Sequence, residues 1–168
     1  MATFKEGLKN ISTFIFDVDG VLSDGTVVLL PDGDQARNMN IKDGYALQLA
    51  AKLGFNVCII SGGNSETVKK RLNGLGINDV YLKVADKIEK YEDYLYSNHL
   101  SHGEILYMGD DMPDYEVMTK VGIACCPDDA VEEIKSISHY ISPNKGGKGC
   151  VRDIIEQVLK TQGKWPVF

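Results

Sequence analysis

Short apolar runs alternate with longer helix-like segments along most of the chain. The runs cover residues 13–16, 55–60, 80–82, 105–108 and 122–125, and helical patterns cover 44–53, 65–75, 87–98, 113–121, 130–136 and 151–162. This alternation is typical of βαβ units, and continuous apolar strands fit a sheet that is buried on both faces. The sequence therefore predicts an α/β fold with a Rossmann-like, doubly wound parallel sheet.

One segment interrupts the alternation. Residues 26–30 and 35–41 read as two strands around the turn Pro31-Asp32-Gly33-Asp34, which predicts a small β-hairpin inserted after strand one. Neither this interval nor the interval between Lys87 and Asp110 has room for a large cap domain. With 168 residues, we expect a single domain over 1–168.

Composition excludes several classes of function. The net charge of −6 argues against a nucleic-acid surface, which needs a basic stripe. The four cysteines fit no zinc spacing and read as reduced thiols of a cytoplasmic protein. No apolar stretch is long enough to cross a membrane. We expect a cytoplasmic protein with no nucleic-acid or membrane partner, and the net charge is compatible with a small anionic substrate in a cleft.

Two aspartates follow the first apolar run. Asp17 and Asp19 are separated by one residue, so both carboxylates can leave an extended strand on the same side, and Gly20 allows a sharp turn afterwards. One carboxylate can attack phosphorus, while the other protonates the leaving oxygen and later activates water. We predict Asp17 as the nucleophile and Asp19 as the acid and base of a phosphatase.

A second acidic cluster follows the run 105–108. Asp110, Asp111 and Asp114 come within five residues, and carboxylates crowded at a buried strand end invite a cation. Mg²⁺ prefers one or two carboxylates together with waters and phosphate oxygens. We expect Asp110 to share a Mg²⁺ with Asp17. Asp114 fits either a helix cap or an outer position around the metal, and Asp111 an outer position.

Ser61 and Lys87 complete the candidate site. Ser61 follows the run 55–60 and precedes a helix, where a hydroxyl and backbone N–H groups can bind a phosphate, although a plain helix cap is the alternative. Lys87 begins a helix and can neutralise a phosphoryl group, although a lone lysine is often only solvated. Ligands bind at the carboxyl ends of strands in open parallel sheets, which favours the functional interpretation.

These motifs, in this order, resemble those of the haloacid dehalogenase superfamily of phosphotransferases over nearly the whole chain. Its strand-end DxD pair matches Asp17 and Asp19, and its acidic cluster matches Asp110, Asp111 and Asp114. Its Ser or Thr and its Lys or Arg match Ser61 and Lys87. The resemblance implies Mg²⁺ as cofactor and a set of metal-binding residues comprising Asp17, Asp19 and Asp110.

Within that superfamily the chain resembles the 3-deoxy-D-manno-octulosonate 8-phosphate phosphatase family. The resemblance is carried by residues 16–25 (FDVDGVLSDG), 40–45 (NIKDGY), 107–111 (YMGDD) and 146–150 (GGKGC), followed by Val151-Arg152. It implies hydrolysis of the 8-phosphate in lipopolysaccharide biosynthesis. It also implies a homotetramer in which subunits share active sites and the C-terminal tail with Trp165 covers the site of a neighbouring subunit. It also implies substrate contacts from Asp19, Asn40, Ile41, Lys42, Asp43, Gly44, Gly62, Arg71 and Lys87.

Two positions depart from the family pattern. Many members carry Arg where this chain has Gly63, and Arg where it has Gln48. Both differences reduce the positive charge that a sugar carboxylate would meet, and Lys42 or Arg71 are candidates to compensate. A nine-carbon sialic-acid-type sugar phosphate is therefore an alternative substrate.

Two other classes of protein are also open. A non-catalytic, phosphatase-like oligomerisation module is disfavoured because it would be expected to lack one of Asp17, Asp19, Lys87 and Asp110. A receiver domain accepts phosphate on an aspartate of an α/β fold, but it lacks the DxDG segment.

Overall fold

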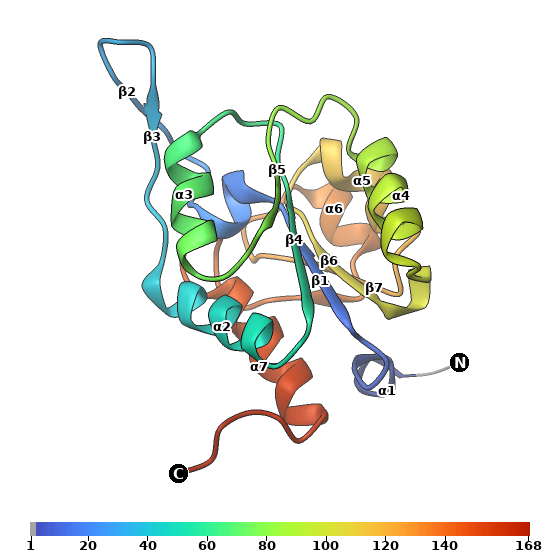
Figure 1. The fold of residues 1–168 in the computed structure, drawn as a ribbon. Helices are drawn as coiled ribbons and strands as arrows, with labels where there is room; N and C mark the ends of the chain where they lie inside the picture. The colour runs from blue at the N-terminus through green and yellow to red at the C-terminus, as the bar shows by residue number, and fades with distance from the viewer. Residues whose placement is uncertain (1–2) are drawn as a thin grey trace.

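The computed structural model describes residues 3–168 and contains a six-stranded, fully parallel sheet (Figure 1). The strand order is β5-β4-β1-β6-β7-β8. The strands are β1 (Thr13–Phe16), β4 (Asn56–Ile60), β5 (Asp79–Tyr81), β6 (Ile105–Met108), β7 (Ile123–Cys126) and β8 (Tyr140–Ile141). The predicted doubly wound α/β fold is confirmed.

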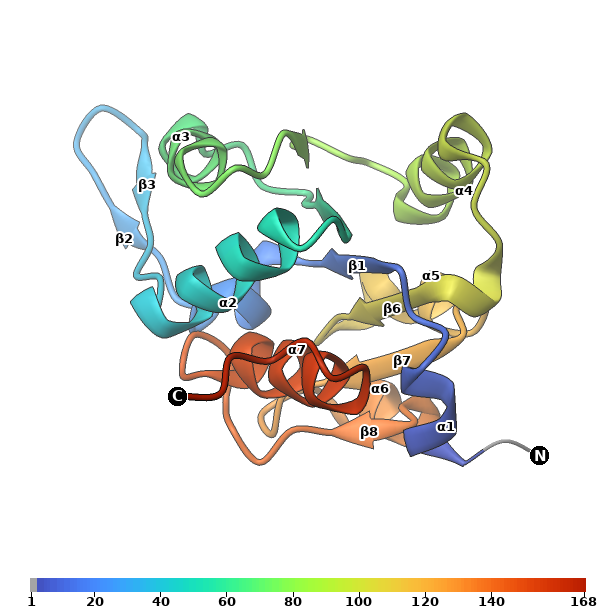
Figure 2. The ribbon, with the colours of Figure 1, turned by 60° about the horizontal axis from the view of Figure 1, so that its bottom comes forward.

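Helices cover both faces of the sheet, as Figures 1 and 2 show. One face packs against α1 (Phe4–Leu8), α2 (Ile41–Lys52), α3 (Glu66–Gly74) and α7 (Cys150–Thr161). The other packs against α4 (Lys87–Asn98), α5 (Tyr115–Met118) and α6 (Glu132–Ile137). Successive side chains of β1 point to opposite faces of the sheet. Phe14 and Phe16 pack in the hydrophobic core on the first face, and Ile15 packs in the core on the second.

The hairpin is shorter than the sequence predicted. Its strands are β2 (Val28–Leu29) and β3 (Gln35–Ala36), and one further bridge joins Ser23 to Met39. The predicted second strand through residue 41 is wrong, and so is the predicted helix start at 44. The reason is Asn40, whose side chain accepts the backbone N–H groups of Lys42 and Asp43 and so caps α2 three residues earlier.

The hairpin extends away from the sheet as an arm (Figures 1 and 2). Its apolar side chains are exposed, and Leu29 reaches 74% exposure. Trp165 of the C-terminal segment instead lies against its own chain, whereas Val167 and Phe168 are exposed. Trp165 packs edge-on against Tyr45 of α2 at 6.4 Å between ring centroids, and Arg152 of α7 lies over the same indole ring. Trp165 thus contacts its own subunit, and the expected cover of a neighbouring site stays a prediction.

In residues 3–168, no helix combines the length and the apolar character needed to cross a membrane.

Candidate active site

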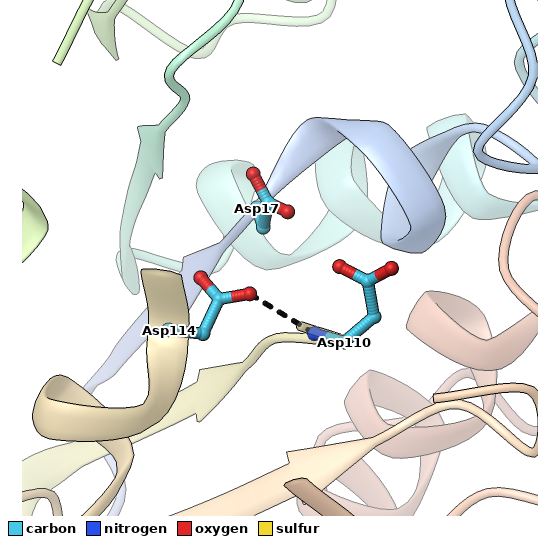
Figure 3. A group of neighbouring side chains, drawn as sticks. All are labelled: Asp17, Asp110 and Asp114. Carbon is cyan, nitrogen blue, oxygen red and sulfur yellow. Dashed lines mark hydrogen bonds between the residues drawn. The ribbon is translucent and has the colours of Figure 1, made fainter. Parts of the chain in front are cut away.

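Three carboxylates converge at the carboxyl end of the central strands (Figure 3). Asp17 follows β1, Asp110 follows β6, and Asp114 comes from the turn after β6. One oxygen from each lies within 4.8 Å of the others. A cavity of about 690 Å³ opens here, and its lining includes Asp17, Asp19, Arg37, Ser61, Gly62, Lys87 and Asp110. The structure thus brings the four predicted catalytic residues to one cavity.

Lys87 and Asp114 hold the nucleophile candidate in place. Lys87 is the first residue of α4, and its Nζ lies 2.8 Å from Asp17 Oδ1 and 2.8 Å from Asp114 Oδ1. Asp114 also accepts the hydroxyl of Tyr107 at 2.6 Å and the backbone N–H of Asp110 at 3.0 Å. Asp114 does not cap α5, but its Oδ2 accepts the backbone N–H of Asp111 at 3.4 Å in the capping box of the 3-10 turn Met112–Asp114. Asp114 therefore joins Lys87 to the loop of Asp110.

Negative charge is crowded in this cavity. Burial and the neighbouring Asp114 raise the pKa of Asp17 to about 6, against the opposing effect of Lys87. Burial and the charges of Asp17 and Asp114 raise the pKa of Asp110 to about 8. Burial alone would lower the pKa of Lys87, but the two carboxylates beside it outweigh burial and raise it. One lysine faces three acids, so a cation is favoured here.

The backbone between β1 and the hairpin leaves room beside Asp110. Gly20 has a φ of +88°, and a Cβ added there would come within 1.8 Å of Asp110 Oδ2. Only glycine therefore allows the turn to pass so close to this carboxylate. The oxygens of Asp17 and Asp110 form a donor set that fits a hard divalent cation such as Mg²⁺.

Asp19 lies in the same cavity but outside the carboxylate cluster. Its two oxygens accept hydrogen bonds from Arg37 of the hairpin, with Nη2–Oδ2 at 3.1 Å, and Ser23 Oγ lies 3.5 Å from Oδ1. The structure does not bring the Asp19 side chain to the group formed by Asp17 and Asp110. Its contribution to metal binding stays a prediction, while its place beside the nucleophile fits a proton-transfer residue.

Ser61 directly follows β4 and is buried, with its Oγ accepting the N–H of Gly63 at 3.0 Å. The helix expected after this loop is present as α3, which begins at Glu66 and is capped by Ser65 rather than by Ser61. Ser61 and Gly62 line the cavity from the loop between β4 and α3, and the phosphate contact expected of them stays a prediction.

The other expected substrate residues lie elsewhere in the single chain. Asn40, Ile41 and Lys42 line a separate cavity of about 670 Å³ between α2 and α7. Asp43 is buried and accepts the backbone N–H of Arg152 at 2.9 Å. Gly44 lies against Arg71, which lines a third hollow below the hairpin. One chain alone does not place these residues at Asp17.

Arg37 is the site residue that sequence reasoning missed. Lys42 and Arg71 were the cations expected to compensate for Gly63, yet neither lines the cavity of Asp17, whereas Arg37 and Gln35 do. No periodic pattern marks an arginine that directly follows an exposed two-residue strand. The available signal was its place on the one insertion that directly follows Asp19.

Comparison with known proteins agrees with this geometry. Residues 73–154 match the family model of haloacid dehalogenase-like hydrolases, which is the class that the fold and the strand-end site define. The chain is 34% identical over 155 residues to 3-deoxy-D-manno-octulosonate 8-phosphate phosphatase of Yersinia pestis, covering 92% of this chain and 83% of that relative. It therefore belongs to the 3-deoxy-D-manno-octulosonate 8-phosphate phosphatase family.

Solved structures show the same likeness. The crystal structure of the Yersinia pestis phosphatase superposes with a TM-score of 0.92 at 32% identity, covering 95% of this chain and 86% of that chain. The Moraxella catarrhalis phosphatase, solved in complex with a magnesium ion, a phosphate ion and a KDO molecule, gives 0.91 at 30% identity, covering 95% and 91%. A cobalt-bound Haemophilus influenzae phosphatase gives 0.90 at 28%, covering 94% and 92%.

Proposed function

We propose that this protein is a Mg²⁺-dependent phosphatase that hydrolyses 3-deoxy-D-manno-octulosonate 8-phosphate to the free sugar acid and phosphate, in lipopolysaccharide biosynthesis. The observation that carries the proposal is the buried carboxylate of Asp17, held 2.8 Å from Lys87 Nζ inside the cavity shared with Asp110. An oriented carboxylate beside a fixed cation suits attack on a phosphoryl group.

The chain's own residues account for two steps. In the first, an oxygen of Asp17 attacks phosphorus, the bond to the sugar oxygen breaks, and Asp19 gives that oxygen a proton. In the second, water attacks the aspartyl phosphate, Asp19 takes a proton from it, and phosphate leaves with Asp17 restored. Lys87 keeps Asp17 oriented, and Ser61 with the loop at Gly62 holds phosphoryl oxygens.

Asp17 and Asp110 would hold the magnesium ion, because their oxygens lie together and their raised pKa values mark uncompensated negative charge. When bound, Mg²⁺ supplies positive charge that stabilises the phosphoryl oxygens. The magnesium and phosphate in the Moraxella catarrhalis relative support this assignment. We retain Asp19 as a further metal-binding residue of the proposal.

A homotetramer with shared sites would explain where the remaining substrate residues lie. Asn40–Gly44 and Arg71 are outside the Asp17 cavity of their own chain, so a neighbouring subunit is the natural place for their substrate contacts. The exposed apolar arm at Leu29 offers a surface for assembly. Four buried free cysteines support a cytoplasmic location.

A substrate panel tests this function. We expect 3-deoxy-D-manno-octulosonate 8-phosphate to give a higher kcat/KM than a nine-carbon sialic-acid-type phosphate and than neutral hexose phosphates. Preference for the nine-carbon substrate would assign the alternative substrate while leaving the chemistry in place. Release of no phosphate from any member would favour the non-catalytic module instead.

A further inference from the structure

A guanidinium from the hairpin lies directly on the carboxylate of Asp19. Arg37 follows β3, and its Nε and Nη2 donate to the two oxygens of Asp19. Gln35 orients the guanidinium, since its backbone carbonyl accepts Nη1 at 3.1 Å and its Oε1 accepts Nη2 at 3.4 Å. Although the hairpin is exposed, the Arg37 side chain is only 6% exposed. The base of the arm is thus tied to the catalytic turn.

Gly63 provides the room for this pair. A Cβ added there would lie 3.2 Å from Arg37 Nη2, 3.2 Å from Asp19 Oδ2 and 3.3 Å from Ser61 Oγ. Such distances are tighter than most real Cβ contacts, so a side chain at this position would press on the pair. The longer hydrogen bond of the pair, Nη2–Oδ2, therefore faces the loop expected to hold phosphate.

We propose that Arg37 is a positioning residue that acts on the reaction through Asp19, by holding one carboxyl oxygen while the other turns to the leaving oxygen. The inference rests on the proposed phosphatase function. Bidentate arginine–carboxylate contacts fix orientation as well as charge. When Nη2 releases Oδ2, the Asp19 oxygen that faces Gly63 becomes free.

Arg37 neither gives nor takes a proton in either step. As the P–O bond breaks, its electron pair stays on the leaving oxygen, which receives the proton from Asp19. The Asp19 carboxylate later recovers a proton from the attacking water. The guanidinium stays protonated throughout, so its effect depends on the presence of Asp19.

The choice of leaving group separates positioning from a merely structural tether. A sugar alcohol leaves poorly without a proton, whereas p-nitrophenolate is stable as an anion and needs none. Loss of Arg37 should therefore slow the first step with the sugar phosphate and spare it with p-nitrophenyl phosphate. A tether that only supports the fold would slow both alike.

The test measures first-turnover release of each leaving group, with enzyme in excess, for wild type, Arg37→Gln, Asp19→Asn and the double variant. We expect Arg37→Gln to slow sugar release about tenfold or more and p-nitrophenolate release less than about threefold. In the Asp19→Asn background, Arg37→Gln should slow sugar release little further, because the effects of two interacting residues are not additive. Arg37→Lys, which keeps one charged donor, should recover part of the sugar rate.

Asn38→Ala is the matched control, because Asn38 is the exposed neighbour of Arg37 on the same arm. Its first-turnover rates should equal those of wild type. Equal slowing of both leaving groups by Arg37→Gln, or an undiminished effect in the Asp19→Asn background, overturns the positioning role. Failure of wild type to release either leaving group would instead overturn the proposed phosphatase function itself.

Discussion

Lys87 Nζ lies 2.8 Å from Asp17 Oδ1 and so joins the proposed nucleophile to the first turn of α4. Both side chains are nearly inaccessible, at 6% and 9% exposure. The same ammonium contacts Asp114 at 2.8 Å, so two buried carboxylates share one cation. The contact gives Lys87 two roles, because it orients Asp17 and it compensates charge that water cannot reach.

Replacing Lys87 with Met should therefore cost both stability and activity. The buried Asp17 and Asp114 would lose their cation, which we expect to lower the free energy of unfolding by about 3–5 kcal/mol at neutral pH. The turnover number should fall about 10²–10³-fold, as for loss of a fixed electrostatic contact. Urea unfolding and steady-state kinetics measure the two effects.

Lys120→Met is the matched control. Lys120 pairs with Glu92 at 2.7 Å, but the two side chains are 38% and 54% exposed, so the change should leave the urea midpoint and the turnover number close to those of wild type. Comparable losses in the two variants would contradict the compensating role of Lys87.

Magnesium binding should weaken as the pH falls. Raised pKa values of about 6 for Asp17 and about 8 for Asp110 mean that a cation competes with protons below pH 8. We expect the half-saturating Mg²⁺ concentration to increase about tenfold or more between pH 8 and pH 6. Activity titrations at fixed pH measure it, with EDTA abolishing turnover and added Mg²⁺ restoring it. A half-saturating concentration independent of pH would rule out this competition.

The metal-free protein should become less stable as the pH rises from about 4 to about 8. Over this window folded Asp110 retains a proton that the unfolded chain has released, so the folded state binds more protons and loses stability with rising pH. Asp110→Asn removes the titrating group and should flatten the slope. Urea unfolding at pH 5 and pH 8 in EDTA compares the two proteins, and identical slopes would refute the assignment.

A charge placed on the exposed apolar hairpin should disrupt the proposed tetramer. Leu29 is 74% exposed, so Leu29→Glu should leave folding intact while disrupting an interface built on the hairpin. Light scattering should give a tetramer for wild type and a smaller species for the variant. Tyr96→Glu, at an 86% exposed position of α4, should leave the mass unchanged. A monomeric wild type with full kcat/KM would argue against shared sites.

The sequence predicted the fold where its signals were local and strong. Buried runs such as Thr13–Phe16 coincide with strands, because apolar β-branched and aromatic residues leave few alternatives. The sequence did not predict β8, because a strand of two residues is too short to show an alternation of apolar and polar side chains. The start of α2 was misplaced because the capping role of Asn40 competes with a strand reading of the same segment.

The candidate site was predictable to a similar extent. Residues that follow strands, such as Asp17, Ser61 and Asp110, meet because parallel strands present their carboxyl ends at one edge. Arg37 could not be placed in advance, since its contact with Asp19 depends on how the hairpin folds back. The separation of Asn40 and Arg71 from Asp17 is also a property of the three-dimensional fold.

Phosphate release from 3-deoxy-D-manno-octulosonate 8-phosphate by wild type and Asp17→Asn, assayed side by side with saturating Mg²⁺, tests the central claim most directly. The amide has nearly the same shape as the carboxylate but cannot attack phosphorus. Wild type should turn over, and Asp17→Asn should lose activity by about 10⁴-fold or more while keeping its circular dichroism spectrum. Turnover by a folded Asp17→Asn protein near the wild-type rate would contradict the account.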